Sequence, residues 1–192
     1  MSLFRLAFGA GDEVIHGKKT LLRHPRMTDF EEWKALRQKS RSFIEEWEPV
    51  WSEDEFSRRA YRQRISVYNE RAINDDGHSF YIFDKVSGAL VGGLTLSHIR
   101  RGVSQSASLG YWMGAPYAGQ GYMKDAVTSL AEAARIRFGL HRLEAACIPR
   151  NERSRHLLLA CGFQPEGYAK AYVKIAGLWE DHLLFGLVIG AR

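Results

Sequence analysis

Hydrophobic residues recur with helical spacing in two long stretches of the chain. In residues 55–73 and again in residues 119–139, apolar positions fall at i, i+4, i+7 and i+11. The second stretch opens on Gly119-Gln120-Gly121 and closes on Gly139, an ending typical of helices. Both stretches therefore predict amphipathic helices.

End signals indicate two further helices. Thr28-Asp29 offers an N-cap for a helix that runs to about Ser40, and Asn151 offers one for a helix that ends before Gly162. Residues 41–55 follow no regular pattern and are expected to be irregular.

Short apolar runs bounded by turn residues predict strands. Those in the first part of the chain cover residues 20–23, 79–83, 90–99 and 107–113, and the later ones cover residues 142–148, 168–175 and 179–188. Consecutive strands joined by short loops pair antiparallel, so a meander should be followed by strand–helix–strand–helix and a closing hairpin. No linker divides the chain. We expect one domain, 1–192, in which residues 1–17 could be a loosely ordered extension.

Composition narrows the classes of protein. The chain has 192 residues, 45% hydrophobic and 26% charged, with 27 Lys and Arg against 22 Asp and Glu and a net charge of +5. This mild positive charge is compatible with binding a phosphorylated cofactor or RNA but does not require either. The basic run Arg58, Arg59, Arg62 and Arg64 is interpreted as a solvated helix face, and a ribosome-associated RNA binder is kept as an alternative. No direct nucleic-acid contact is expected.

Cysteine and histidine usage indicates a protein of the reducing cytoplasm. Cys147 and Cys161 belong to no CxxC pair and lie among apolar residues, so both are expected to be reduced. The seven histidines show no metal-binding spacing, and no metal is expected. The N-terminal stretch is too interrupted for a secretory signal, and no apolar run approaches the ~18 residues that span a membrane.

The glycine-flanked start of the helix near residue 119 could bind phosphate. The first turn of a helix carries unpaired N–H groups and partial positive charge, and glycines let a phosphate approach the backbone. Residues 119–123 are therefore a candidate pyrophosphate cradle, with Lys124 as a nearby cation. A plain turn explains the same pattern. It is neither a Walker loop nor a full dinucleotide fingerprint.

A second motif is Asn151-x-x-Ser154. Asn151 would cap the helix, and Ser154 would share a face with Leu158 and Cys161 by i, i+4, i+7 spacing. The alternative is a capped, leucine-rich core helix without a chemical role.

Together these motifs resemble the GNAT N-acetyltransferases, most closely those of the RimJ/RimL type that acetylate ribosomal-protein N-termini. The stretches that carry the resemblance are FIEEWEPVW, LGYWM…PYAGQGYMKDA and HRLEAACIPRNERSRHLLLACGFQPEGYAKAYVKIAGLWEDHLLFGL. The resemblance implies an α/β (α+β) GNAT fold, with a mixed, mostly antiparallel sheet flanked by helices. It also implies a splayed strand pair that holds acetyl-CoA.

The resemblance also assigns residues. Those expected to hold acetyl-CoA are Trp112, Met113, Gly119, Gln120, Gly121, Tyr122, Met123, Lys124 and Asn151. Ser154 would lie near the sulfur and, with Asn151, forms the expected catalytic pair. The acidic, aromatic loop of residues 45–55 would face a cationic substrate, and the expected substrate contacts are Trp47, Trp51 and Tyr111.

Several positions depart from the family pattern. Two of these positions are the ends of the phosphate loop, where Ala118 and Met123 stand in place of the residues that are common in the superfamily. The tyrosine that serves many relatives as general acid is replaced by Leu158, so Ser154 is the better proton donor. Ser108 stands where many relatives carry a glutamate, which leaves the general base unassigned.

The missing carboxylate favours an α-amine as acceptor, because its pKa of about 7.7–8.0 leaves much of it neutral, unlike a lysine amine at about 10.4. A protein N-terminus, such as that of a ribosomal protein, is the expected acceptor. A small amine (antibiotic, amino acid or polyamine) and a non-catalytic acyl-CoA-binding module are the alternatives. We also expect the amine to attack acetyl-CoA directly in a ternary complex. The protein is expected to be a monomer or homodimer and to make no membrane contact.

Overall fold

The computed structural model describes residues 14–190, which form an eight-stranded sheet of order β1-β2-β3-β4-β5-β6-β8-β7. Neighbouring strands pair antiparallel except β5 and β6, which are parallel. The strands are β1 (Val14–His16), β2 (Thr20–Arg23), β3 (His78–Asp84), β4 (Leu90–Arg100), β5 (Ser106–Met113), β6 (Arg142–Cys147), β7 (Gln164–Ile175) and β8 (Leu178–Val188).

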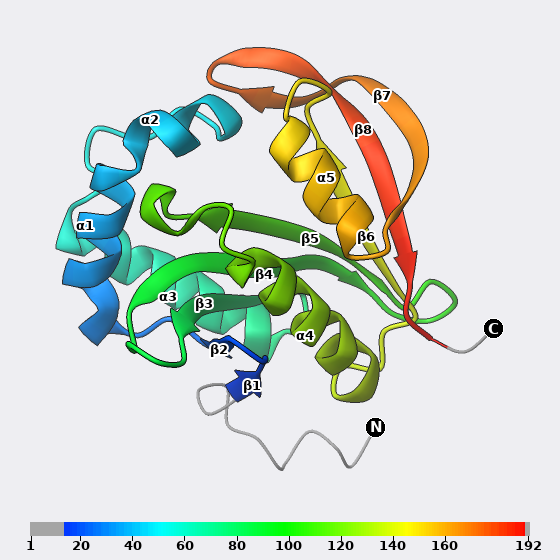
Figure 1. The fold of residues 1–192 in the computed structure, drawn as a ribbon, viewed down its shortest axis with the longest axis horizontal. Coiled ribbons are helices and arrows are strands. Elements are labelled where there is room, and N and C mark those ends of the chain that lie inside the picture. The colour runs from blue at the N-terminus through cyan, green and yellow to red at the C-terminus, as the bar shows by residue number, and fades with distance from the viewer. Residues whose placement is uncertain (1–13, 191–192) are drawn as a thin grey trace.

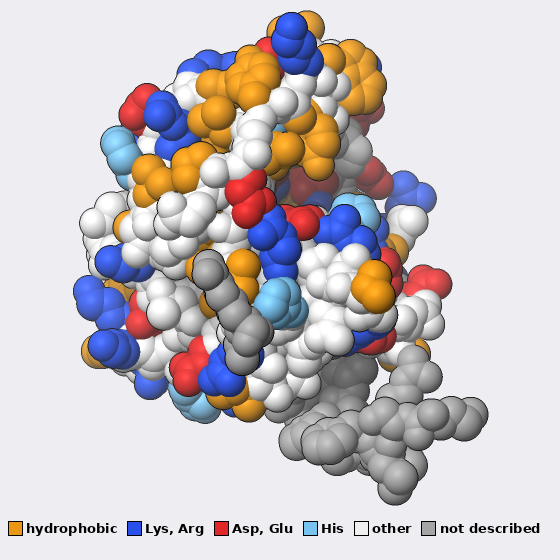
Figure 2. All heavy atoms as spheres, turned by 90° about the vertical axis from the view of Figure 1, so that its right-hand side faces the viewer, with side chains coloured by type: hydrophobic (Ala, Val, Ile, Leu, Met, Phe, Trp, Pro, Cys, Tyr) orange, Lys and Arg blue, Asp and Glu red, His pale blue; other side chains and the backbone are white. Residues whose placement is uncertain are grey.

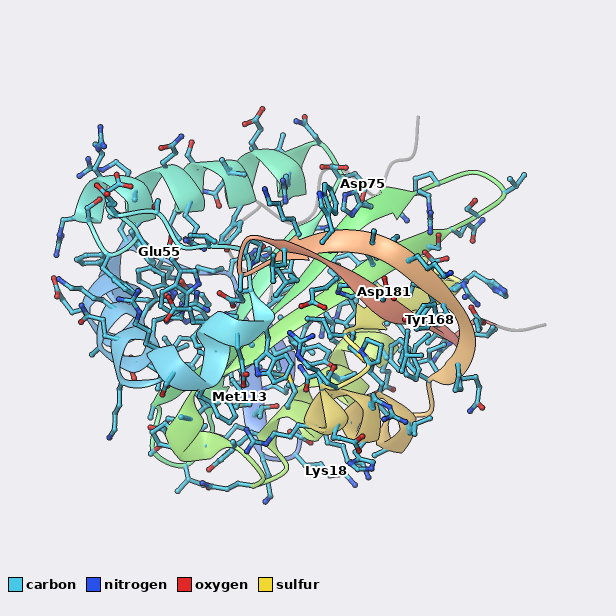
Figure 3. The ribbon with its side chains drawn as sticks, turned by 90° about the horizontal axis from the view of Figure 1, so that it is seen from above. Lys18, Glu55, Asp75, Met113, Tyr168 and Asp181 are labelled. Atoms are coloured by element: carbon cyan, nitrogen blue, oxygen red, sulfur yellow. The ribbon has the colours of Figure 1, made fainter. Side chains whose placement is uncertain are left out.

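Helices cover both faces of this sheet. Figure 3 shows α3 on one side and α4 and α5 on the other, and Figure 1 shows α2 across the end of β5 from α5. The helices are η2 (Met27–Asp29), α1 (Phe30–Lys39), α2 (Arg41–Ile44), η3 (Glu45–Trp47), α3 (Arg58–Ile73), η4 (Ala115–Tyr117), α4 (Tyr122–Ile136) and α5 (Glu152–Ala160), where η marks 3₁₀ turns.

The two faces of the sheet carry separate hydrophobic cores. Side chains alternate along β3, so Phe80 and Ile82 pack with the α4 and α5 side, whereas Tyr81 and Phe83 pack with α1 and α3. Paired residues of neighbouring strands point to the same face, so the alternation also assigns a face to each residue of those strands.

The predicted meander is confirmed by the antiparallel pairing of β3, β4 and β5. The splayed strand pair is present as well. β5 and β6 pair only from Ser106–Ser108 to Arg142–Glu144, although both strands continue beyond these residues. The sheet is therefore open between the ends of β5 and β6.

Two local predictions were wrong, and a third is only partly covered by the described residues. The segment of residues 41–55 is not wholly irregular, since it contains α2 and η3. Asp29 does not cap α1, because its carboxylate accepts hydrogen bonds from the Arg23 guanidinium and the Arg26 N–H instead. The expected extension, residues 1–17, lies outside the described residues up to position 13, and Val14–His16 forms a strand.

Three features of the described residues bear on which partners the protein could bind. Arg58, Arg59 and Arg64 of the basic run are in ion pairs with neighbouring carboxylates. Within residues 14–190, no helix is long and apolar enough to cross a membrane. Figure 2 shows exposed hydrophobic side chains over β7 and β8, where Tyr168, Tyr172 and Trp179 are at least half exposed.

Candidate active site

A cavity of about 870 Å³ lies where β5 and β6 separate. Its walls come from the end of β5, the loop and first turn of α4, the end of β6, the start of α5, the α2–η3 segment and β8. Of the residues predicted to be functional, Trp47, Tyr111, Trp112, Met113, Gly119, Gly121, Tyr122, Met123, Lys124, Asn151 and Ser154 line it. Segments far apart in the sequence thus meet in one hollow.

The open edge of β5 faces this cavity. The N–H of Gly114 donates to the carbonyl of Val91 in a 2.8 Å hydrogen bond. Successive N–H groups along a strand point to opposite edges, so the N–H of Met113 points away from β4, toward the side from which β6 has diverged. This edge can therefore pair with an extended ligand, as an added strand would.

The start of α4 has the geometry of an anion site. Gly119 and Gly121 have φ of +75° and +83°, and a Cβ added to either would meet no heavy atom within 4 Å. The backbone is thus openly accessible there, and the first-turn N–H groups of α4 carry partial positive charge. Lys124 adds a cation to the cavity wall. Gln120 is not part of that wall, since its side chain donates to the Pro116 carbonyl at 2.7 Å.

Asp125 ties this turn to the rest of the sheet, a role that the sequence did not reveal. Its carboxylate accepts hydrogen bonds of 2.9–3.0 Å from the N–H groups of Lys18, Lys19 and Thr20 and one of 2.7 Å from the Thr20 hydroxyl. Desolvation raises the pKa of the Asp125 carboxyl, but these hydrogen bonds oppose it and leave the pKa below its usual value. An acidic residue in a first helical turn was the only signal of this clamp.

Two hydroxyls meet in the wall of the cavity. The Tyr111 phenol lies 2.7 Å from Ser154 Oγ, and Asn151 Oδ1 accepts from the Ser154 N–H at 3.0 Å, which confirms the predicted cap. Burial raises the pKa of Tyr111 above its usual value, although the hydrogen bond to Ser154 opposes this shift. The phenol therefore keeps its proton near neutral pH and can supply it to Ser154.

The neighbouring thiols are poor nucleophiles. Burial raises the pKa of both Cys147 and Cys161, so the reactive thiolate form is disfavoured. Leu158, expected from the resemblance at the position of the usual tyrosine, is fully buried in the core, and Met123 packs in the same core. Leu158 has no proton to donate, whereas the hydroxyls of Tyr111 and Ser154 are placed for proton transfer.

The structure separates the two tryptophans that were predicted together. Trp47 lines the main cavity, whereas Trp51 lines a second cavity of about 370 Å³ on the α1 and α3 side. Trp51 packs over the guanidinium of buried Arg37 at 4.5 Å, and its Nε1 donates to Glu48 at 2.7 Å. Arg37 in turn holds Glu48 through two hydrogen bonds of 2.8 and 2.6 Å.

Sequence reasoning overlooked His182 as a site residue. It is 5% exposed on β8 and lines the main cavity. The pairing of β6 with β8 brings it to the gap, and no local sequence signal reports that pairing.

Comparisons with known proteins agree with this geometry. Residues 19–164 match the family model described as an acetyltransferase (GNAT) domain. The chain is 35% identical to the probable N-acetyltransferase YjcK of Bacillus subtilis, over 91% of this chain and 97% of that protein. It is also 35% identical to the ribosomal protein uS5-alanine N-acetyltransferase of Escherichia coli, over 77% of this chain and 76% of that protein.

The solved structure of Mycobacterium smegmatis RimJ in complex with CoA-disulfide superposes with a TM-score of 0.87 at 28% identity, over 93% of this chain and 88% of that one. The family match covers most of the chain and two relatives exceed 30% identity over most of their own length. The chain therefore belongs to the GNAT family of N-acetyltransferases.

Proposed function

We propose that this acetyltransferase acts in the cytoplasm and moves the acetyl group of acetyl-CoA onto the N-terminal α-amine of a protein, with a ribosomal protein as the substrate class. The observation that carries the proposal is the single cavity of about 870 Å³ that joins the first turn of α4, the open edge of β5 and the Tyr111–Ser154 pair.

The chain's residues suit the cofactor. Acetyl-CoA supplies a thioester that is already activated toward amines. The N–H groups at the start of α4 and Lys124 would hold its pyrophosphate, because a helix N-terminus favours anions. The free edge of β5 at Trp112 and Met113 would bind the extended pantetheine arm, with Asn151 beside it.

The residues around the gap would then assist a direct transfer. The Met113 N–H would stabilise the negative charge that develops on the carbonyl oxygen. Ser154 would protonate the departing sulfur and be supplied by the Tyr111 phenol, whose raised pKa keeps it protonated. The raised pKa of Cys147 disfavours an acetyl-cysteine intermediate and supports direct attack within a ternary complex.

Two observations favour a protein N-terminus as acceptor. Relatives of this chain at 35% identity include an enzyme that acetylates the alanine of ribosomal protein uS5. Of the acidic, aromatic segment of residues 45–55, Trp47 and Glu48 line the cavity, and the face of the Trp47 ring can contact a cationic chain end. An α-amine with a pKa of about 7.7–8.0 also needs less help to lose its proton than a lysine.

A thiol-release assay with four acceptors tests the proposal. The acceptors are a peptide that begins with alanine, the same peptide with a blocked N-terminus and an internal lysine, a polyamine and an aminoglycoside. We expect the free-N-terminal peptide to give the highest kcat/KM. Equal or faster turnover of the lysine peptide, the polyamine or the aminoglycoside would assign the acceptor to another class.

A further inference from the structure

Three side chains in the wall of the main cavity could accept a proton: Glu48, His156 and His182. Glu48 is already engaged, because its two oxygens accept hydrogen bonds from both terminal nitrogens of Arg37 and from Trp51 Nε1. Its lone pairs therefore face donors of the protein and are not available to an ammonium group.

His156 is largely exposed to solvent and so lies outside the enclosed part of the cavity. It lies on α5, its side chain is 77% exposed, and its Nε2 is 3.9 Å from the Glu152 carboxylate on the preceding turn. His182 remains, and it is almost fully buried.

The hydrogen bond of His182 determines which nitrogen can act as a base. Nδ1 lies 3.0 Å from the backbone carbonyl of Glu180. A carbonyl oxygen can only accept, so Nδ1 must carry the hydrogen, and in the neutral ring the lone pair is on Nε2. Glu180 is itself fixed by Arg150, which donates to both carboxylate oxygens at 2.9 Å. The ring is thereby held in a tautomer whose Nε2 can take a proton.

The strand register places His182 on the acceptor side of the gap. Leu183 pairs with Cys147, and both lie on the face of the sheet that packs with α4 and α5. The preceding residue, His182, therefore points to the opposite face, the one that carries Ser108. Trp47 borders the same cavity from η3. An amine that enters past Trp47 would thus reach His182 on the face opposite the cofactor.

We infer that His182 is the general base of the reaction, a catalytic residue that contacts the acceptor amine through Nε2; this inference rests on the proposed acetyl transfer. One proton moves from the acceptor ammonium to Nε2 and then to solvent. The amine nitrogen bonds to the carbonyl carbon, the carbon–sulfur bond breaks, and the second N–H proton reaches the sulfur through the hydroxyls of Ser154 and Tyr111. His182 thereby takes the role that Ser108 cannot fill.

Charged and titratable groups are present in the elements near the imidazole. Its own strand provides Glu180 and Asp181, both of which interact electrostatically with it. The Tyr172 ring of β7 lies 5.7 Å away, Arg150 comes from the turn before α5, and Glu48 follows η3. A general base acts only in its unprotonated form, so activity is expected to fall at low pH.

The substitution His182→Asn tests the inference, because the Asn amide can still donate to the Glu180 carbonyl but cannot act as a base. We expect kcat/KM to fall by about 10²-fold or more at neutral pH. The loss should shrink at high pH, where the acceptor amine is already neutral, and acetyl-CoA affinity should not change. Nitrogen NMR of the wild-type imidazole should show hydrogen on Nδ1 and the lone pair on Nε2.

His98→Asn is the matched control, since His98 is exposed on β4 at φ 51°, a conformation that asparagine tolerates. A His182→Asn enzyme with the pH profile of the wild type would overturn the inference. An equal loss at every pH, or an imidazole with hydrogen on Nε2, would also overturn it. If the wild type acetylates a polyamine and no peptide, the proposed acceptor fails while the His182 test still runs on the polyamine.

Discussion

The hydroxyl pair of Tyr111 and Ser154 is the smallest unit with a chemical role in this protein. Ser154→Ala removes the atom nearest the expected sulfur position, so we predict a loss of kcat on the order of 10²-fold with little change in acetyl-CoA affinity. Tyr111→Phe removes the partner 2.7 Å away, and the double variant should lose less than the two single losses combined. Steady-state kinetics measure both effects.

Ser104→Ala, in the exposed loop between β4 and β5, is the control for this pair. A Ser154→Ala enzyme that retains the wild-type kcat would remove the serine from the mechanism.

Asp125 gives a prediction for the dependence of stability on pH. Its folded-state pKa is lowered, so its carboxylate contributes stability that is complete above the usual Asp value of about 3.9 and is lost as pH falls through the lower folded pKa. Asp125→Asn should lower the free energy of unfolding by about 1–2 kcal/mol at pH 7. The difference from wild type should shrink near pH 3.

Urea unfolding at both pH values measures that difference. Glu152→Gln is the control, because Glu152 is also an acid in a first helical turn but bonds only to the side chains of its own helix. A difference that persists unchanged at pH 3 would show that the carboxylate charge is not what holds the β1–β2 turn.

Single residues also show which contacts could be predicted from the sequence and which could not. The Asn151 cap was found because cap and N–H donor are three positions apart. The Asp29 cap was wrong because Arg23, on another element, competes for the carboxylate. The contact between Tyr111 and Ser154 joins positions 43 residues apart, and only the tertiary fold creates it.

Among the elements, the turn into α4 depends on a backbone that only some residues adopt. Gly121 has φ +83°, a conformation that costs a β-branched side chain roughly 1–2 kcal/mol. Gly121→Val should shift the first-turn N–H groups and weaken acetyl-CoA binding by about tenfold or more, whereas Gly121→Asn should bind nearly as the wild type does. Calorimetric titration with acetyl-CoA measures both.

Gly88 in the β3–β4 turn provides the comparison, since it has φ +74° and equally open surroundings. Gly88→Val should lower stability to a similar degree without an effect on acetyl-CoA. Equal weakening of acetyl-CoA binding by both valine variants would mean that the α4 turn has no special part in it.

The α2–η3 segment separates two roles that the sequence had combined. Trp47→Ala should raise the acceptor KM by about fivefold, roughly 1 kcal/mol, while the acetyl-CoA KM changes little. Trp51→Ala should instead lower the melting temperature, because Trp51 covers Arg37 and donates to Glu48. Effects of Trp47→Ala confined to acetyl-CoA would contradict the assignment of this wall to the acceptor.

The long elements were predictable because their periodicity extends over many residues, as in α3, α4 and the meander. The α2 helix has four residues, too few to show a helical period, and β1 has three. Elements this short carry little local signal, and β1 also depends on contacts with α4, which lies far along the chain.

At the scale of the whole molecule, acetyl-CoA bound between β5 and β6 should increase the thermal stability of the protein. At a concentration of 100 times its Kd, acetyl-CoA should stabilise the protein by about 2.7 kcal/mol. For a chain of this size, that corresponds to a rise in Tm of roughly 5–10 °C. Thermal unfolding with and without acetyl-CoA measures it, and an unchanged Tm would argue against the cavity as the cofactor site.

The outermost strand has a consequence for how copies of this protein behave at high concentration. β7 is an edge strand of 12 residues, long enough to template pairing with another chain. Its register is interrupted between Ala169 and Val173, where the Asp181 carboxylate binds the Ala171 N–H and the Tyr168 hydroxyl (Figure 3). Exposed Lys170 lies within the interruption, and exposed Lys174 follows it. The edge is thus divided into short, charged pieces, which protects the protein from edge-to-edge aggregation.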